Sequence, residues 1–216
     1  IALMIVVVAP GQGSQTPGFL EPWIADPAHR TRLERYSEAA GIDLVAHGTV
    51  SDADTIRDTA IAQPLIVAAS LLSAHALLDG RRERVGAVAG HSVGEFAAAA
   101  VAGVLSDVDA VRLVRERGLA MADAAAVVPT GMSAVLGGDE DALAARLTDL
   151  GLTAANRNGG GQVVVAGELP ALAALAADPV PGSRVIPLQV AGAFHTTYMS
   201  SAVDRLRDAV SGVAVG

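Results

Sequence analysis

The sequence contains no cysteine and no lysine. Without cysteine the chain has no disulfide, no thiolate nucleophile and no cysteine-ligated metal. Without lysine it has neither a lysine Schiff base nor the phosphate-binding lysine of a P-loop. All fifteen basic residues are therefore arginine, and local arginines must meet any anionic substrate.

Aromatic residues make up only 3% of the chain, whereas 51% of its 216 residues are hydrophobic, chiefly Ala, Val and Leu. This content suffices for one large domain, or for a medium-sized domain with a smaller one inserted. No apolar run reaches the roughly 18 residues of a bilayer span, and the apolar start lacks the basic leader of a signal peptide. We therefore expect a soluble, cytoplasmic protein. The formal net charge of -8 argues against nucleic acid as a partner.

Two short apolar runs predict buried parallel strands. Met4–Ala9 ends at a Pro-Gly pair, and Val85–Ala89 ends before Gly90. Helical stretches such as Ile61–Leu78 lie between them, and strands that alternate with helices imply a parallel sheet. After Gly90 we expect an Ala-rich helix to about residue 102 and a second helix over 107–125, capped by Ser106.

The pattern changes at Gly131 to the βαββαβ order of a ferredoxin-like module. The expected elements are a strand over 132–136, a helix over 139–150, strands over 152–156 and 162–166, a helix over 168–177 and a strand over 184–188. The chain then returns through a strand-like segment, Val190–Phe194, to a closing helix around 201–210. The small module therefore interrupts a larger α/β domain.

Residues Gly90-His91-Ser92-Val93-Gly94 form a GxSxG motif between a predicted strand and a predicted helix. In a nucleophile elbow this context lifts the serine hydroxyl above the sheet edge. The backbone N–H groups that follow point into the same space and can hold an oxyanion. Ser92 is therefore the candidate nucleophile, and the Val93 N–H is the first candidate oxyanion donor.

A serine nucleophile needs a base, and the chain has five histidines. His91 adjoins the serine and should point away from it. His75, on a predicted helix, and His29 and His47, near loops, are expected to be surface or structurally satisfied histidines. His195 follows small residues at the end of the strand-like segment, where catalytic groups of open α/β sheets gather. Taken alone, it is equally well interpreted as a base or as an ordinary loop histidine.

Two further residues are ambiguous on the sequence alone. Gln12 lies between two glycines in GQGSQ, so its backbone can approach a ligand, or the segment can be an ordinary strand-to-helix turn. Arg117 lies on the helix over 107–125, where an arginine is more often solvated than functional.

These residues together resemble the malonyl-CoA:acyl-carrier-protein transacylase family. The similarity rests on six segments in order: Gln12 in GQGSQ, Gln63-Pro64, Ser92 in GHSVGE, Arg117 in RERGLAM, Asn158 in NRNGGGQVVVAG and His195 in GAFHT. It runs from about Met4 to the last helix, and GHSVGE combined with a distant GAFH is specific.

The resemblance implies an α/β fold in which an α/β-hydrolase-like core with a parallel sheet, residues 1–127 and 189–216, carries a ferredoxin-like subdomain, residues 128–188. It implies catalysis by Ser92 and His195, an oxyanion hole of the Gln12 and Val93 backbone N–H groups, and a substrate-binding set of Arg117, Gln63, His91 and Asn158. Arg117 would hold the malonyl carboxylate with its planar fork. The implied substrates are malonyl-CoA and the phosphopantetheine thiol of an acyl carrier protein, with no permanently bound cofactor and no metal. We expect a monomer.

No carboxylate offers itself as a third triad member, and the resemblance implies that a backbone carbonyl and a glutamine orient the histidine instead. That glutamine belongs to a C-terminal segment of the family that this chain lacks. We therefore expect residues beyond this chain rather than a smaller fold, because losing core strands and helices would expose apolar surface.

An acidic carrier protein needs a locally basic docking face, and Arg81, Arg82 and Arg84 form the densest basic cluster. A solvated loop is the simpler interpretation of that cluster. Two other functions fit parts of the sequence: an acyltransferase domain of a modular polyketide synthase and, with less support, a serine esterase, which would not need Arg117. A nucleotide-binding module fails for want of a GxGxxG motif or a P-loop.

Overall fold

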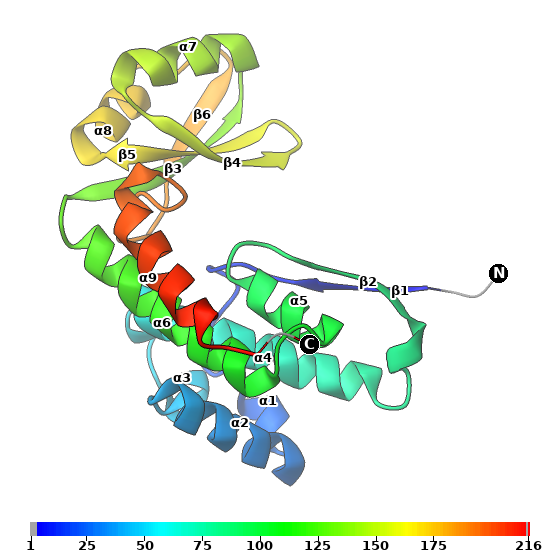
Figure 1. The fold of residues 1–216 in the computed structure, drawn as a ribbon. Helices are drawn as coiled ribbons and strands as arrows, with labels where there is room; N and C mark the ends of the chain where they lie inside the picture. The colour runs from blue at the N-terminus through cyan, green and yellow to red at the C-terminus, as the bar shows by residue number, and fades with distance from the viewer. Residues whose placement is uncertain (1–3, 215) are drawn as a thin grey trace. The chain divides into compact units, whose positions relative to one another are not determined.

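The structure is a computed structural model that describes residues 4–214 and 216 (Figure 1). The described residues form two compact units. One contains the residues up to Leu119 and those from Leu206 onward, and the other contains Ala120–Arg205. Residues 1–3 and 215, which the core prediction includes, lie outside the described residues.

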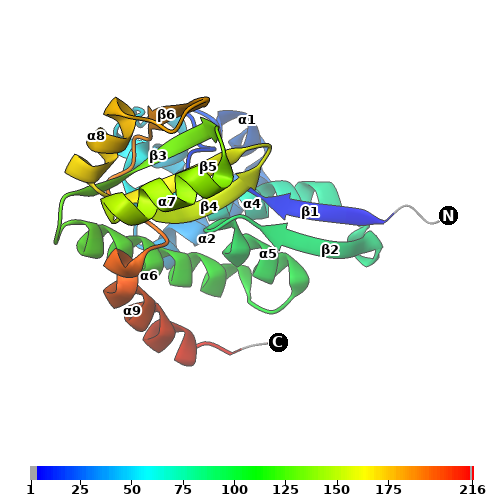
Figure 2. The same ribbon diagram turned by 90° about the horizontal axis from the view of Figure 1, so that it is seen from above.

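The first unit contains the parallel strand pair that the sequence predicts. β1 (Ile5–Ala9) pairs in parallel with β2 (Val85–Gly90), in a register that ends at Ala9 opposite Gly90. The chain crosses between them through α4 (Thr59–Leu78), and α5 (Gly94–Ala102) follows β2. Both strands therefore end at the same edge, and the loops that follow them lie side by side (Figure 2).

The interpretation of these strands as buried is wrong. Val6 and Val8 of β1 are 54% and 69% exposed, as is Met4 just before the strand at 65%, and all of β2 is exposed or half-buried. The two strands pair with each other, and α4 and α5 pack on one face of the pair. Among the described residues no third strand joins this sheet, so alternate side chains of β1 point to solvent.

Three helices that the sequence analysis does not separate fill the crossover before α4. They are α1 (Glu21–Ile24), α2 (Pro27–Ala40) and α3 (Leu44–Thr49), followed by the short 3-10 helix η1 (Thr55–Arg57). His29 lies in the first turn of α2 and His47 in the last turn of α3, so both are near loops. Asp26 and Asp43 begin these helices by accepting backbone N–H bonds from Ala28 and Ala46 at 2.8 and 2.9 Å.

Helix α4 forms the centre of the first unit. It is long and apolar enough to cross a membrane, with a mean hydropathy of 1.7, but 61% of that stretch is buried inside the protein. Its buried Leu65, Leu71 and Leu72 pack in one cluster with Leu33 of α2 and Val114 of α6 (Asp107–Ala125). Gln63, Ser70 and His75 interrupt the apolar sequence of α4. Burial of α4 in this core therefore accounts for the length and the hydropathy of the helix.

The second unit contains the ferredoxin-like module, whose prediction is confirmed. Its elements are β3 (Thr130–Gly137), α7 (Glu140–Leu150), β4 (Thr153–Gly159), β5 (Gln162–Glu168), α8 (Leu169–Ala177) and β6 (Ser183–Pro187). All neighbouring strands pair antiparallel in the order β4-β5-β3-β6. Helices α7 and α8 cover one face of this sheet (Figure 2), where Leu147, Val165 and Leu175 share a buried cluster.

The segment Val190–Phe194 is not a strand, contrary to the prediction. Ala193 and Phe194 are instead buried beside Met121 and Ala124 of α6, in a cluster of the second unit. The 3-10 helix η3 (Thr197–Met199) and α9 (Ser200–Ser211) follow. Burial of small apolar side chains against a helix, rather than strand pairing, explains why this segment is apolar.

Candidate active site

Ser92 occupies a strained turn between β2 and α5. Its φ is 53°, in the left-handed region, and it shares a positive φ with His195 alone among the described non-glycine residues. Such a conformation costs about 1–2 kcal/mol and persists only where surrounding contacts impose it. Here the Gly94 N–H donates to the His91 carbonyl at 3.0 Å and the Glu95 N–H to the Ser92 carbonyl at 3.1 Å.

Two glycines bring the loop after β1 against this turn. A Cβ on Gly94 would lie 2.4 Å from the Ala9 carbonyl oxygen, and a Cβ on Gly11 would lie 2.4 Å from Nδ1 of His91. The His91 N–H donates to that same Ala9 carbonyl at 3.0 Å. The GQG loop and the GxSxG turn are therefore in direct contact, and the His91 ring lies over Gly11.

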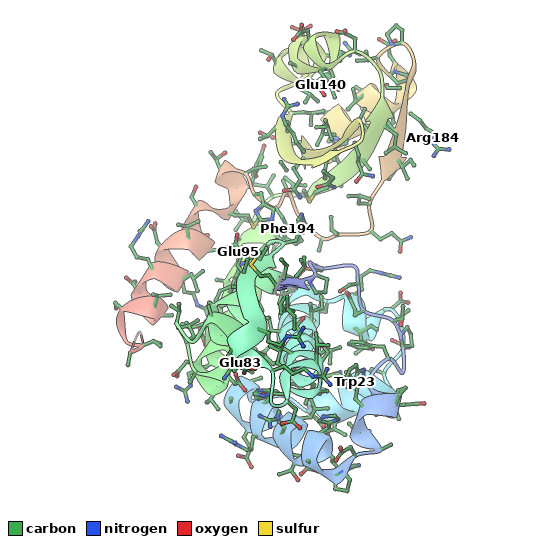
Figure 3. All side chains as sticks on the ribbon, turned by 90° about the vertical axis from the view of Figure 1, so that its right-hand side faces the viewer. Trp23, Glu83, Glu95, Glu140, Arg184 and Phe194 are labelled. Carbon is green, nitrogen blue, oxygen red and sulfur yellow. The ribbon has the colours of Figure 1, made fainter. Side chains whose placement is uncertain are left out.

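Arg117 lies against Ser92, although its position on α6 alone favours a solvated side chain. Its Nη2 donates to Ser92 Oγ at 3.2 Å and its Nη1 to Gln63 Oε1 at 2.6 Å. Gln63 is fully buried on α4. Burial lowers the pKa of Arg117, and the nearby Glu95 carboxylate, at the start of α5, opposes that shift (Figure 3). The guanidinium stays charged because arginine loses its proton only far above neutral pH.

Gln12 reaches the start of α4 from the loop after β1. Its Nε2 donates to Thr59 Oγ1 at 3.3 Å, and Thr59 is only 4% exposed. No sequence motif singles out Thr59. A signal for it exists, because Thr59 lies four residues before Gln63 and hence on the same face of a helix.

Val93 is buried and directly precedes α5. Its N–H therefore lies at a helix N-terminus, where the partial positive charge of the helix favours an oxyanion. Ser92, Arg117, Gln63, Gln12, Val93 and His91 all belong to the first unit. Arg117 is hydrogen-bonded to both Ser92 and Gln63, and Gln12 is hydrogen-bonded to Thr59.

His195 and Asn158 belong to the second unit. His195 is exposed, with a φ of 61°, directly after the buried Phe194. Its turn is held on both sides, because the Ala193 N–H donates to Thr130 Oγ1 at 3.0 Å and Thr196 Oγ1 donates to the Ala193 carbonyl at 2.6 Å. Asn158 is exposed near the end of β4, where its Nδ2 donates to Gln162 Oε1 at 2.8 Å.

The other histidines have structural partners. His29 bonds the Trp23 carbonyl at 3.2 Å, His47 bonds Ser51 Oγ at 3.0 Å, and His75 bonds Asp107 at 2.6 Å. Of the described residues, none forms a cluster of three or more His, Asp or Glu side chains that could hold a metal ion.

The arginine cluster lies at the other end of β2 from Ser92. Arg82 and Arg84 belong to the 3-10 helix η2 (Arg82–Arg84), which directly precedes β2. Ser92 instead follows the other end of β2. The six residues of β2 span about 20 Å, so roughly this distance separates the arginine cluster from Ser92.

Comparison with known proteins first defines the class. Residues 6–215 match the family model described as "Acyl transferase domain", so the protein is an acyltransferase. A malonyl CoA-acyl carrier protein transacylase from Mycobacterium tuberculosis is 52% identical over 98% of this chain and 70% of that protein. One from Escherichia coli K12 is 34% identical over 92% of this chain and 67% of that protein.

Solved structures agree with this placement. The crystal structure of MCAT from Mycobacterium tuberculosis superposes with a TM-score of 0.94 at 52% identity, over 98% of this chain and 71% of that one. A malonyl-transacylase in complex with a type II PKS acyl-carrier protein superposes with a TM-score of 0.89 at 30% identity, over 99% and 71%. The chain belongs to the malonyl CoA-acyl carrier protein transacylase family, and it spans about 70% of the length of these relatives.

Proposed function

We propose that the protein transfers a malonyl group from malonyl-CoA to the phosphopantetheine thiol of an acyl carrier protein, through a malonyl ester of Ser92. The observation that carries the proposal is the position of Arg117, which lies at hydrogen-bond distance from the strained Ser92 hydroxyl. A charged, planar fork beside the nucleophile suits an acyl group that ends in a carboxylate. A serine esterase for neutral esters would have no use for it.

In the first half-reaction His195 takes the proton of Ser92 Oγ while this oxygen forms a bond to the malonyl thioester carbon. The N–H groups of Val93 and Gln12 stabilise the resulting oxyanion. When the tetrahedral intermediate collapses, the carbon–sulfur bond breaks and His195 gives its proton to the sulfur of coenzyme A.

In the second half-reaction His195 takes a proton from the carrier-protein thiol, and the thiolate attacks the malonyl ester. The ester bond breaks and the proton returns to Ser92 Oγ. The kinetics are therefore ping-pong, because coenzyme A leaves before the carrier protein reacts. Arg117, oriented by Gln63, holds the malonyl carboxylate, and His91 and Asn158 contact the remainder of the substrate. No cofactor is bound permanently.

The proposal assigns residues 1–127 and 189–216 to the catalytic core and 128–188 to the small subdomain. It places the protein in the cytoplasm as a monomer that binds neither membrane nor nucleic acid. Its product supplies extender units for fatty acids, polyketides or both. The same chemistry in an acyltransferase domain of a modular polyketide synthase is the alternative.

Intact mass spectrometry tests the covalent step. Wild-type protein incubated with malonyl-CoA should gain the mass of one malonyl group, whereas Ser92→Ala should gain none. The control Ser211→Ala, at the exposed end of α9, should gain one malonyl group like the wild type. Added holo acyl carrier protein should remove the group from the enzyme and acquire it. Labelling that persists in Ser92→Ala, or its absence in the wild type, contradicts the proposal. Loss of the group to water at the same rate without carrier protein favours an esterase.

A further inference from the structure

We propose that Thr59 is a positioning residue for the oxyanion hole: its buried hydroxyl holds the Gln12 side chain and so fixes the Gln12 backbone N–H beside Ser92. The inference rests on the function proposed above, which assigns that N–H to the oxyanion. Thr59 does not touch the reacting atoms. It acts through Gln12, whose Nε2 donates to Thr59 Oγ1 at 3.3 Å.

The loop that carries Gln12 needs such an anchor. Residues 10–17 form neither helix nor strand, so few backbone hydrogen bonds of their own restrain them. Two side chains of the loop instead reach η1 and the start of α4. Gln12 bonds the Thr59 hydroxyl, and Gln15 Nε2 bonds the Ile56 carbonyl at 3.0 Å. Gln15 Oε1 also accepts from the Gly13 N–H at 2.9 Å, which closes the loop on itself.

The anchor itself is fixed on two sides. Asp58 caps α4 by accepting the Ala60 N–H at 2.8 Å, and Arg115 of α6 donates from Nη1 to the Ala60 carbonyl at 2.6 Å. Thr59 is only 4% exposed, so little water reaches its hydroxyl to replace Gln12. A partly buried hydrogen bond to a group held in this way restrains the loop more than a fully exposed one does.

The first turns of α4 make two separate hydrogen bonds to residues of the site. Thr59 holds Gln12, and Gln63, four residues further along the helix, accepts from Arg117 at 2.6 Å. Loss of the Thr59 hydroxyl removes the hydrogen bond to Gln12 and leaves the bond between Gln63 and Arg117 in place. It should therefore slow attack on the thioester without changing the preference for malonyl over acetyl groups.

Single-turnover acylation of Ser92, followed by intact mass, measures this separation. Thr59→Val removes the hydroxyl at nearly constant volume and should lower the acylation rate constant about tenfold. This is less than the roughly hundredfold to thousandfold cost of deleting an oxyanion donor, because the Gln12 N–H is still present. Thr59→Ser restores the acceptor and should recover most of the rate. Thr49→Val removes a hydroxyl that bonds only the Val45 carbonyl of its own helix, and it should leave the rate unchanged.

A double-mutant cycle with Gln12→Ala shows whether the effect passes through Gln12. That variant keeps the backbone N–H but has no side chain for Thr59 to hold, so adding Thr59→Val to it should lower the rate no further. Additive losses, an unchanged rate in Thr59→Val, or a shift in its malonyl-to-acetyl ratio equal to that of Arg117→Ala overturns the inference.

Failure of the proposed function gives a different result, because wild-type protein would then take up no malonyl group. In that case the side-chain amide signals of Gln12 in ¹⁵N-correlated NMR spectra decide the positioning role by themselves. They should move in Thr59→Val and return in Thr59→Ser. Signals that stay in place in Thr59→Val overturn it.

Discussion

Arg117 Nη2 donates to Ser92 Oγ at 3.2 Å, so the guanidinium contacts the hydroxyl of the proposed nucleophile. Its other terminal nitrogen is held at 2.6 Å by the amide oxygen of Gln63, which is buried and uncharged. A neutral acceptor orients the fork without neutralising it, whereas a carboxylate there would compete with the substrate. The positive charge therefore remains available for an anionic acyl group.

Replacing Arg117 with alanine should shift the acyl preference toward uncharged groups. A charge-assisted pair contributes about 1.5–3 kcal/mol, so we expect a tenfold to hundredfold fall in the malonyl-to-acetyl ratio of kcat/KM. Arg117→Lys should recover only part of the ratio, because an ammonium lacks the planar fork. Arg112→Ala, also on α6 but exposed and paired with Asp109, is the matched control. A ratio that survives in Arg117→Ala contradicts this role.

Gln63 offers a test of the neutral acceptor itself. Gln63→Leu keeps the volume and removes the acceptor, so KM for malonyl-CoA should rise about tenfold, as expected for the loss of about 1.4 kcal/mol. Gln63→Glu places a charge beside the guanidinium and should weaken malonyl binding more than leucine does. If glutamate weakens it less than leucine, orientation matters and the charge of Arg117 does not. Circular dichroism of each variant checks that the buried substitution leaves the fold intact.

The sequence predicts the elements that follow strong local patterns. The helix over 107–125 has the predicted bounds, and Ser106 Oγ accepts the Asp109 N–H at 3.1 Å as a cap should. The ferredoxin-like order is equally legible, because alternating strands and capped helices follow one another without long loops. Asp139, for example, caps α7 through the Ala142 N–H at 2.8 Å.

What the sequence does not predict depends on partners far along the chain. An apolar strand such as β1 is buried only if both faces of its sheet are covered, and Val6 and Val8 are exposed. Arg117 is indistinguishable from a solvated arginine until Gln63, 54 residues earlier, is placed beside it. Thr59 is overlooked for the same reason, because its partner Gln12 is 47 residues away.

Gly94 should not tolerate a side chain, because its Cβ would lie 2.4 Å from the Ala9 carbonyl oxygen, a backbone atom that cannot move aside alone. Gly94→Ala should cost about 1–3 kcal/mol of unfolding free energy in urea titrations. It should also slow malonylation, since separating the two loops displaces Ser92. Gly212→Ala, whose nearest neighbour lies at an ordinary 3.7 Å, is the control. Equal stability of the two variants would show that the loops are not in forced contact.

Tyr36 should make stability depend on pH in the alkaline range. Its O–H donates to Asp107 Oδ2 at 2.8 Å, beside His75 and Arg32, which also contact that carboxylate. Burial, together with the Asp107 charge, raises the pKa of Tyr36 well above its usual value of 10. Above about pH 10 the unfolded chain therefore loses this proton before the folded protein does, and the free energy of unfolding falls as the pH rises.

Tyr36→Phe removes both the proton and the hydrogen bond. Near neutral pH it should cost about 1.5–3 kcal/mol, the range for a hydrogen bond to a charged group, because Asp107 loses a donor in a half-buried site. Above about pH 10 its stability should then fall less steeply than that of the wild type, so the two curves converge. Urea titrations between pH 7 and 11 measure both effects. Tyr198→Phe is the surface comparison: its hydroxyl bonds Glu168, and the pKa of Tyr198 is also raised, so its curve should deviate from the wild type in the same sense but by a smaller amount, because solvent screens an exposed pair. Parallel curves for Tyr36→Phe and wild type would mean that Tyr36 ionises alike in the folded and unfolded chains.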